Sequence, residues 1–262
     1  MLPARVDRSV LLSALRARRL DRTLTSALPG IDPHDEQAVG LTGLPALDAR
    51  LGGGLPRGQL SEVVGPRSSG RTSLLLQIVA TATTRGDLVA VVDALDMLDV
   101  ASAAAAGVDL AKLLWIRGHV VTNPGLCRDL NQRAMEQAMK ALGLVLQAGN
   151  FGLVALDLGD APADAVRRLP FTTWLRLQRM VEGSQTICVL AGNESMSRSA
   201  AGLSIKLQPS PQAGTDLHVR KSGRFAGQLF DGLDIDARVM RARVQASDPV
   251  ALPLVSKVAC HV

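Results

Sequence analysis

The sequence Leu60-Ser-Glu-Val-Val-Gly-Pro-Arg-Ser-Ser-Gly-Arg-Thr72 decides the fold of this chain. Its first five residues are mostly apolar and predict a buried strand, and residues 65–70 form a loop of glycine, proline, arginine and serine. Residues 72–81 follow without a helix breaker and predict a helix. Because a strand, a glycine-containing loop and a helix in this order open a βαβ unit, we expect an α/β fold.

The loop fits the phosphate-binding pattern Gly-x-x-x-x-Gly-Lys-Ser/Thr at every position but one, where Arg71 replaces the lysine. Glycines let successive backbone N–H groups converge on phosphate oxygens, and the helix N-terminus adds a partial positive charge. A planar guanidinium needs more room than an ammonium beside the phosphates, so we expect weakened binding of ATP or ADP with Mg²⁺. The alternative is a relic loop that binds no nucleotide. The candidate nucleotide-binding residues are Gly65, Arg67, Ser68, Ser69, Gly70, Arg71, Thr72 and Ser73.

The candidate metal ligands are Thr72 and Asp157. Thr72 is placed to ligate Mg²⁺ at the start of the helix, and Asp157 directly follows the apolar run 153–156. A carboxylate that emerges at the carboxyl end of such a strand can hold the water shell of Mg²⁺. An ordinary surface aspartate is the alternative reading of Asp157.

The middle of the chain predicts a mostly parallel sheet covered by helices on both faces, because short apolar runs alternate with helical stretches. After residue 203 the pattern has period two, with turn signals between segments, and predicts an antiparallel extension. We expect a basic helix and linker at residues 1–37, a core at 38–245 and a tail at 246–262. The expected strands are residues 88–92, 113–116, 153–156 and 186–190, and the expected helices are 100–106, 124–148 and 172–182.

Composition narrows the function classes. No window resembles a membrane span or a cleaved leader, so we expect a cytoplasmic protein. The three cysteines lie far apart and predict neither a disulfide nor a zinc site. The net charge of +5 is compatible with a nucleic-acid partner, but tyrosine is absent and aromatic residues make up 2% of the chain, so contacts to single-stranded DNA would be to its backbone.

The order of these motifs resembles that of the RecA-like P-loop family. The resemblance begins at Thr42-Gly-Leu-Pro-Ala-Leu-Asp48 and Gly52-Gly-Gly-Leu-Pro-Arg-Gly58, and after the phosphate loop it continues through Val91-Val-Asp-Ala94 and Gly107-Val-Asp-Leu110. The small size and the Arg-rich Trp174-Leu-Arg-Leu-Gln-Arg179 helix look most similar to ImuA, the RecA paralogues encoded with components of mutagenic translesion polymerases. The resemblance implies a RecA-like core at residues 38–245.

Two departures from RecA decide the functional reading. In RecA the Asp-Ala after the second core strand is followed by a glutamate that activates the attacking water, and here Leu95 holds that place. Leucine cannot accept a proton, and a one-residue shift at a strand end would point the adjacent Asp96 elsewhere. Residues 158–168 and 193–202, which correspond to the DNA-binding loops of RecA, are short. We therefore expect no catalytic residue and at most a weak ATPase.

The resemblance leaves several functions open. The first hypothesis is an accessory protein of SOS mutagenesis and translesion synthesis, a degenerate-ATPase adapter for RecA or for a translesion polymerase subunit. Contacts with the backbone of single-stranded DNA and with further copies of the chain belong to this hypothesis, and contact with a membrane does not. The alternative is an active DNA-dependent ATPase that exchanges strands. Other RecA-like roles, such as regulators of cell division or of clock-type assemblies, also stay open.

The run Val219-Arg-Lys-Ser-Gly-Arg224 resembles the place of the cations that reach a neighbouring subunit's nucleotide in RecA filaments. The resemblance makes Arg220, Lys221 and Arg224 candidates for contacts between subunits or with a partner. A solvated hairpin is the alternative. The basic helix of residues 8–22 would, in the same reading, pack against an adjacent RecA-like core.

Overall fold

The computed structural model describes residues 39–118, 128–159, 161–197, 201–209, 219–221, 230–242 and 252–257. All of them belong to the second of the two units into which the chain divides, Asp32–Val262. In these residues nine strands form one sheet in the order β11-β10-β8-β3-β7-β6-β4-β5, with β9 paired to β10. The expected basic helix of residues 1–37 lies outside the described part of the chain.

Six neighbouring strands of this sheet run parallel. They are β5 (Leu113–Arg117), β4 (Val89–Asp93), β6 (Leu153–Asp157), β7 (Ile187–Gly192), β3 (Leu60–Val64) and β8 (Ala201–Pro209). Every residue of β3, β4, β6 and β7 is buried, which explains why β4, β6 and β7 are almost entirely apolar and do not alternate between apolar and polar residues. The expected mostly parallel α/β sheet is confirmed.

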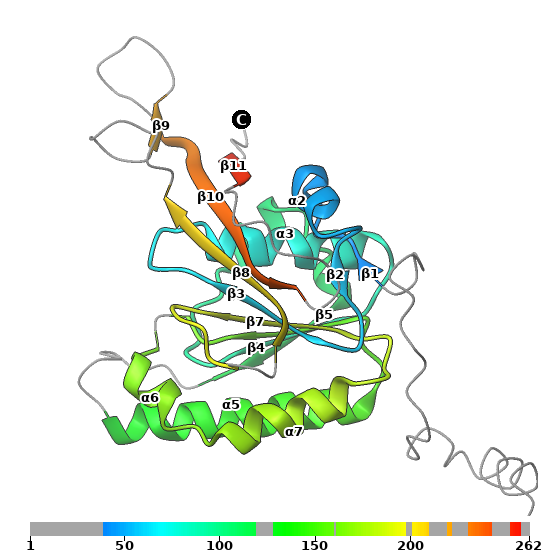
Figure 1. Ribbon diagram of the computed structural model, residues 1–262, viewed down its shortest axis with the longest axis vertical. Coiled ribbons are helices and arrows are strands. Elements are labelled where there is room, and N and C mark those ends of the chain that lie inside the picture. The colour runs from blue at the N-terminus through cyan, green and yellow to red at the C-terminus, as the bar shows by residue number, and fades with distance from the viewer. Residues whose placement is uncertain are drawn as a thin grey trace, which may run out of the picture. The chain divides into compact units, whose positions relative to one another are not determined.

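Helices cover both faces of the sheet (Figure 1). On one face α3 (Arg71–Thr84) packs through Leu75, Ile78 and Val79 against side chains such as Val63 and Val189. The other face is covered by α5 (Arg128–Ala148) and α7 (Phe171–Val181), with the short α6 (Ala163–Arg167) beside them. The remaining helical elements are α2 (Pro45–Arg50), α4 (Val100–Ala105) and the 3₁₀ turn η2 (Leu110–Lys112).

The antiparallel extension begins one strand later than the sequence pattern suggests. β8 itself pairs parallel with β3, whereas β10 (Phe230–Ala242) pairs antiparallel with β8, and both β9 (Val219–Lys221) and β11 (Leu252–Lys257) pair antiparallel with β10. The sheet thus continues into residues 246–262, the segment that we expected to be a tail. The backbone groups of β10 that face away from β8 need hydrogen-bond partners, and β11 and β9 supply them.

A hydrogen-bonded turn leads the chain into the core after β1 (Val39–Gly40), which pairs with β2 (Leu55–Pro56). The Oδ1 atom of buried Asp48 accepts hydrogen bonds from the backbone N–H of Thr42 (2.8 Å) and from its hydroxyl (2.7 Å). These bonds close the turn around Gly43, whose φ is +83°. No described helix is long and apolar enough to cross a membrane.

Replacing Asp48 by alanine should lower the free energy of unfolding by about 1.5–3 kcal/mol, because two buried donors of Thr42 lose a charged acceptor. Asp99→Ala is the matched control, since exposed Asp99 accepts the same pair of bonds from Ser102 and its loss should cost about 1 kcal/mol. Urea denaturation measures both. Equal losses would contradict the structural role of the buried turn.

Candidate functional site

The phosphate loop is folded as a tight turn between β3 and α3. Ser68 and Gly70 both have positive φ, at 60° and 82°, and the backbone N–H of Gly65 donates to the carbonyl of Gly192 at the end of β7 (3.1 Å). A Cβ atom on Gly65 would lie 2.6 Å from the carbonyl oxygen of Leu207, and one on Gly70 would collide with Ile235 of β10. Close packing therefore requires a glycine at position 65, and at position 70 the positive φ adds a conformational reason.

Arg71 begins α3 but turns its guanidinium toward the protein. Its Nη1 atom donates to the carbonyl of Gly65 (2.7 Å) and to the side-chain oxygen of Asn193 (2.6 Å), and its Nη2 atom donates to the carbonyl of Gly159 (3.0 Å). The residue is only 7% exposed. These acceptors follow three different strands, β3, β7 and β6. The arginine that replaces the lysine of the phosphate-binding pattern thus ties together the carboxyl ends of the three central strands.

The other candidate phosphate and metal residues lie on the phosphate loop, the first turn of α3 and the end of β6. Thr72 and Ser73 are exposed on the first turn of α3, Arg67 and Ser68 are exposed on the loop, and Ser69 is buried. Asp157 ends β6, is 8% exposed, and accepts a hydrogen bond from the backbone N–H of Gly159 (2.8 Å). Hydroxyl and carboxylate oxygens at these places are ligands that suit Mg²⁺, so Thr72 and Asp157 stay the predicted metal ligands.

The turn after β4 carries the residues around Leu95. The carboxylate of Asp93 accepts hydrogen bonds from the backbone N–H groups of Met97 and Leu98 and from the indole of Trp115. Leu95 is 3% exposed and belongs to the apolar core below the sheet. In the described residues the water-activating position of the resemblance is therefore occupied by a core side chain.

Asp96 does not substitute for the missing carboxylate at this position. It has a φ of 57° and forms two hydrogen bonds of 2.8 Å with the guanidinium of Arg117 on β5, which also stacks over Trp115. These hydrogen bonds lower the pKa of Asp96 from its usual value, so the side chain is held as a carboxylate. A group bonded in this way at the edge strand is a poor proton acceptor.

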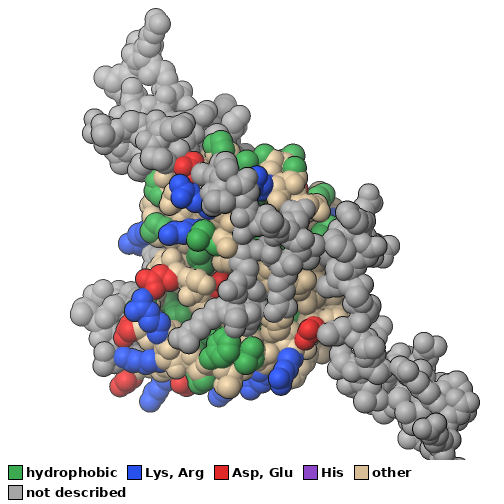
Figure 2. Space-filling view, viewed as in Figure 1, with side chains coloured by type: hydrophobic (Ala, Val, Ile, Leu, Met, Phe, Trp, Pro, Cys, Tyr) green, Lys and Arg blue, Asp and Glu red, His purple; other side chains and the backbone are tan. Residues whose placement is uncertain are grey.

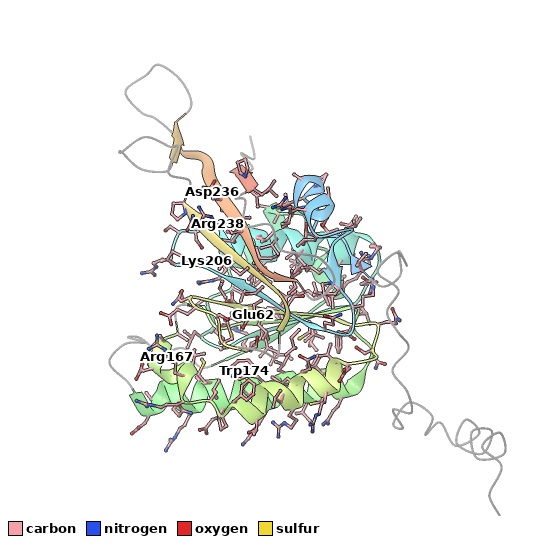
Figure 3. The ribbon with its side chains drawn as sticks, in the orientation of Figure 1. Glu62, Arg167, Trp174, Lys206, Asp236 and Arg238 are labelled. Carbon is pink, nitrogen blue, oxygen red and sulfur yellow. The ribbon has the colours of Figure 1, made fainter. Side chains whose placement is uncertain are left out.

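Two loops at the carboxyl edge of the sheet complete the site. Residues 158–168 include α6, and residues 193–197 follow β7; Arg167 and Glu194 join the two loops by an exposed ion pair of 2.6 Å. The second loop is anchored from below by Glu62 of β3, which is fully buried and labelled in Figure 3. Its carboxylate accepts hydrogen bonds from the N–H groups of Met196 (2.9 Å) and Ser197 (2.6 Å) and from the hydroxyl of Ser195 (2.8 Å).

The structure describes only part of the run that carries the predicted partner cations. Arg220 and Lys221 belong to β9, where Arg220 pairs in register with Gly232, and Arg224 is outside the described residues. Two other cations, Lys206 and Arg238, face each other across β8 and β10 and are exposed (Figure 3). This pairing could not be predicted from the sequence, because it depends on the register of the two strands.

Comparisons with known proteins match this architecture. The profile of the RecA N-terminal domain family matches residues 31–157, a segment that contains the phosphate loop and ends at Asp157. The chain is 29% identical over 222 residues to Protein RecA of Chlorobium chlorochromatii, covering 78% of this chain and 58% of the relative. It is 40% identical over 129 residues to Protein RecA of Salinispora tropica, and 39% identical over 125 residues to that of Bordetella petrii.

These matches and the order of the sheet support membership of the RecA-like family. The two shorter alignments cover 49% and 47% of this chain, but only 33% and 31% of the relatives. The chain thus spans between 31% and 58% of the length of these curated relatives.

Sequence reasoning missed three residues that the structure brings to the site: Glu62, Gly159 and Asn193. Glu62 stands in a strand that is mostly apolar, and a charged residue in such a place is a signal that it needs buried partners. Gly159 contributes a backbone carbonyl, which no side-chain pattern reveals. Asn193 lies 122 residues from Arg71 in the sequence, so nothing local connects the two.

Arg71→Ala should lower the free energy of unfolding by about 1.5–3 kcal/mol, because one buried and two partly buried acceptors lose a charged donor. It should also speed amide hydrogen exchange in residues 158–159 and 193–197, since the tie between these segments is lost. Arg167→Ala is the control on the same loops, and its exposed ion pair with Glu194 should contribute less than about 1 kcal/mol. Unchanged exchange in Arg71→Ala would show that the guanidinium does not hold the loops.

Proposed function

We propose that this chain is a RecA-like accessory protein of DNA damage tolerance that acts as an adapter and not as a recombinase. In this proposal it resembles ImuA and connects RecA, or a translesion polymerase subunit, with damaged DNA during SOS mutagenesis in the cytoplasm. The observation that carries the proposal is the burial of Leu95 in the core at the place where the family resemblance expects a water-activating glutamate. Without a proton acceptor there, ATP hydrolysis loses a contribution of about 10²–10⁴ in rate.

The nucleotide site fits a binding role with weak turnover. Its backbone keeps the two glycines and the helix start that cradle phosphate, while Arg71 is already bonded to protein acceptors. Residues 65–73 would hold ATP or ADP, and Asp157 would contact the Mg²⁺ ion. Binding of the nucleotide would then control whether the chain binds its partner. In the proposal, the adapter contacts only the sugar-phosphate backbone of single-stranded DNA. It also associates with further copies of the chain.

An active DNA-dependent ATPase with strand exchange is the second candidate, because the curated relatives are named Protein RecA. The two candidates differ in their response to single-stranded DNA. A recombinase would hydrolyse ATP faster when DNA is added, whereas an adapter would not.

Restoring the lost groups with Leu95→Glu and Arg71→Lys together should raise ATP turnover at least about tenfold, and by more than the product of the single changes. The lysine would order the phosphates and the glutamate would order water in one transition state. Steady-state phosphate release measures turnover, and circular dichroism confirms folding of each variant.

The control variant carries Met97→Glu with Arg71→Lys and keeps Leu95. Its new carboxylate stands at an exposed position of the same turn. It should leave turnover unchanged. A null or merely additive effect of the restored pair would mean that the loss of hydrolysis has another cause.

Replacing Arg220, Lys221 and Arg224 together by alanine should reduce pull-down of purified RecA or of a translesion polymerase subunit at physiological salt. Electrostatic contacts of this kind weaken as salt rises, because the Debye length is about 8 Å at physiological ionic strength and shorter above it. Recovery of both proteins is measured over a series of salt concentrations.

The control removes the same charge from exposed positions on the helical layer, with alanine at Arg133, Lys140 and Arg176. This control should bind as wild type does. Equal recovery by the two triple variants at every salt concentration would remove the β9 cations from the interface.

A further inference from the structure

Arg71 stands where the phosphate-binding pattern places a side chain that touches the ligand. In that pattern the residue before the serine or threonine reaches the β- and γ-phosphates of a bound nucleotide. In this chain the guanidinium donates instead to the carbonyl of Gly65 (2.7 Å), to the side-chain oxygen of Asn193 (2.6 Å) and to the carbonyl of Gly159 (3.0 Å). The side chain that the pattern assigns to phosphate is therefore already bonded to the protein.

Two of these three acceptors lie outside the phosphate loop. Gly65 opens the loop itself, so the bond to its carbonyl keeps the guanidinium beside the backbone that would cradle phosphate. Gly159 and Asn193 follow β6 and β7, and their bonds hold the guanidinium at the ends of those strands. A phosphate group that enters the cradle must compete with these two acceptors for the same N–H groups.

The shape of the guanidinium makes this competition strict. Its N–H groups lie in one plane and point in fixed directions, so one orientation serves one set of acceptors. Nη1 carries two N–H groups and donates to both Gly65 and Asn193, while Nη2 donates to Gly159. Turning the group to bond phosphate through two parallel N–H groups would break the bond to Asn193 or the bond to Gly159. A lysine ammonium, which rotates on a flexible stem, would not have this restriction.

Binding of phosphate therefore carries the cost of breaking a charge-assisted hydrogen bond. Arg71 is 7% exposed, and bonds from a charged donor in such a place are stronger than bonds between neutral groups. The apparent affinity for a ligand falls in proportion to the fraction of molecules that are in the binding-competent orientation. The size of the guanidinium is thus one cause of weak nucleotide binding, and its bonds to the protein are a second and separable cause.

The described cations of the neighbouring loops are balanced by carboxylates. Arg167 pairs with Glu194 across the two loops. Arg168 pairs with Asp164 in the segment that contains α6. On the face of the described residues that Figure 2 shows, Lys and Arg side chains likewise lie among Asp and Glu side chains. Paired surface charges of this kind attract an anion only weakly, so the orientation of Arg71 has a large influence on the affinity for phosphate.

We propose that Gly159 and Asn193 hold Arg71 in an autoinhibited orientation, and that a nucleotide binds tightly only when the guanidinium exchanges these acceptors for phosphate oxygens. The proposal rests on the nucleotide-binding role proposed above and names how that site is regulated. Asn193 is then a positioning residue that lowers the affinity for nucleotide, the opposite of a residue that contacts the ligand. A contact that moves the loop after β7 away from Arg71 would raise the affinity, and by linkage bound nucleotide would loosen that loop.

The direct test measures the affinity of the full chain for a fluorescent ADP analogue with Mg²⁺. Asn193→Ala removes one competing acceptor, so the dissociation constant should fall by about 3–10-fold, because a charge-assisted bond no longer has to be broken. The matched control is Ser195→Ala, which removes a bond of the same loop to Glu62 and does not involve Arg71. This control should bind the analogue as the wild type does. Equal or weaker binding by Asn193→Ala would overturn the proposal.

A double-mutant cycle shows whether the effect of Asn193 passes through Arg71. In an Arg71→Ala background, Asn193→Ala should leave the dissociation constant unchanged, since no guanidinium remains to be released. If Arg71→Ala binds too weakly to measure, Arg71→Lys replaces it. The gain should then be smaller than in the wild type, because a compact ammonium cannot bond the three acceptors at once. A gain as large as that in the wild-type background would contradict the proposal.

The same titrations separate this proposal from the proposed function. Saturable binding by the wild type that Asn193→Ala tightens supports both. Binding by Asn193→Ala alone supports the autoinhibited orientation and refutes a role for nucleotide in the wild-type chain. Binding by the wild type that Asn193→Ala does not tighten leaves the proposed function standing and overturns the autoinhibited orientation. Absence of binding by both chains contradicts the two proposals together.

Discussion

The three hydrogen bonds of the Arg71 guanidinium are the interaction on which the carboxyl edge of the sheet depends. A buried cation must be bonded on its polar atoms or it destabilises the fold, and here the acceptors come from the ends of three central strands. The phosphate loop, the segment before α6 and the segment after β7 are therefore fixed relative to one another. The candidate nucleotide site and the two loops beside it share this support, since Gly159 and Asn193 both bond to Arg71.

The part of the candidate site suited to binding phosphate and the part expected to activate water for hydrolysis lie in different turns, the phosphate loop and the turn after β4. The backbone of residues 65–70 keeps the positive φ values at Ser68 and Gly70 that a phosphate cradle needs. The turn after β4, by contrast, has Leu95 in the core and Asp96 bonded to Arg117 at the edge strand. In the proposed function, the first feature would let the chain bind nucleotide, and the lack of a free carboxylate at the second described turn would make turnover slow. The sheet positions these loops at its carboxyl edge whether or not hydrolysis occurs.

The local parts of this structure could be predicted from the sequence, and the long-range parts could not. The strand, loop and helix at residues 60–84 follow from apolar runs and glycines, and the parallel sheet follows from the alternation of strands and helices. α6 was missed because its five residues are too few to show a helical period. The acceptors of Arg71 were missed because residues distant in sequence provide them. The charge in Glu62 was readable, but its partners at residues 195–197 depend on which strands are neighbours.

Equilibrium binding of a fluorescent ATP analogue to the wild-type chain, measured beside ATP turnover with and without single-stranded DNA, tests the central claim most directly. The account predicts saturable binding in the presence of Mg²⁺, turnover close to the background rate, and no stimulation by DNA. Brisk turnover that rises when single-stranded DNA is added would contradict it, because the chain would then hydrolyse ATP without the water-activating carboxylate that the resemblance places at Leu95.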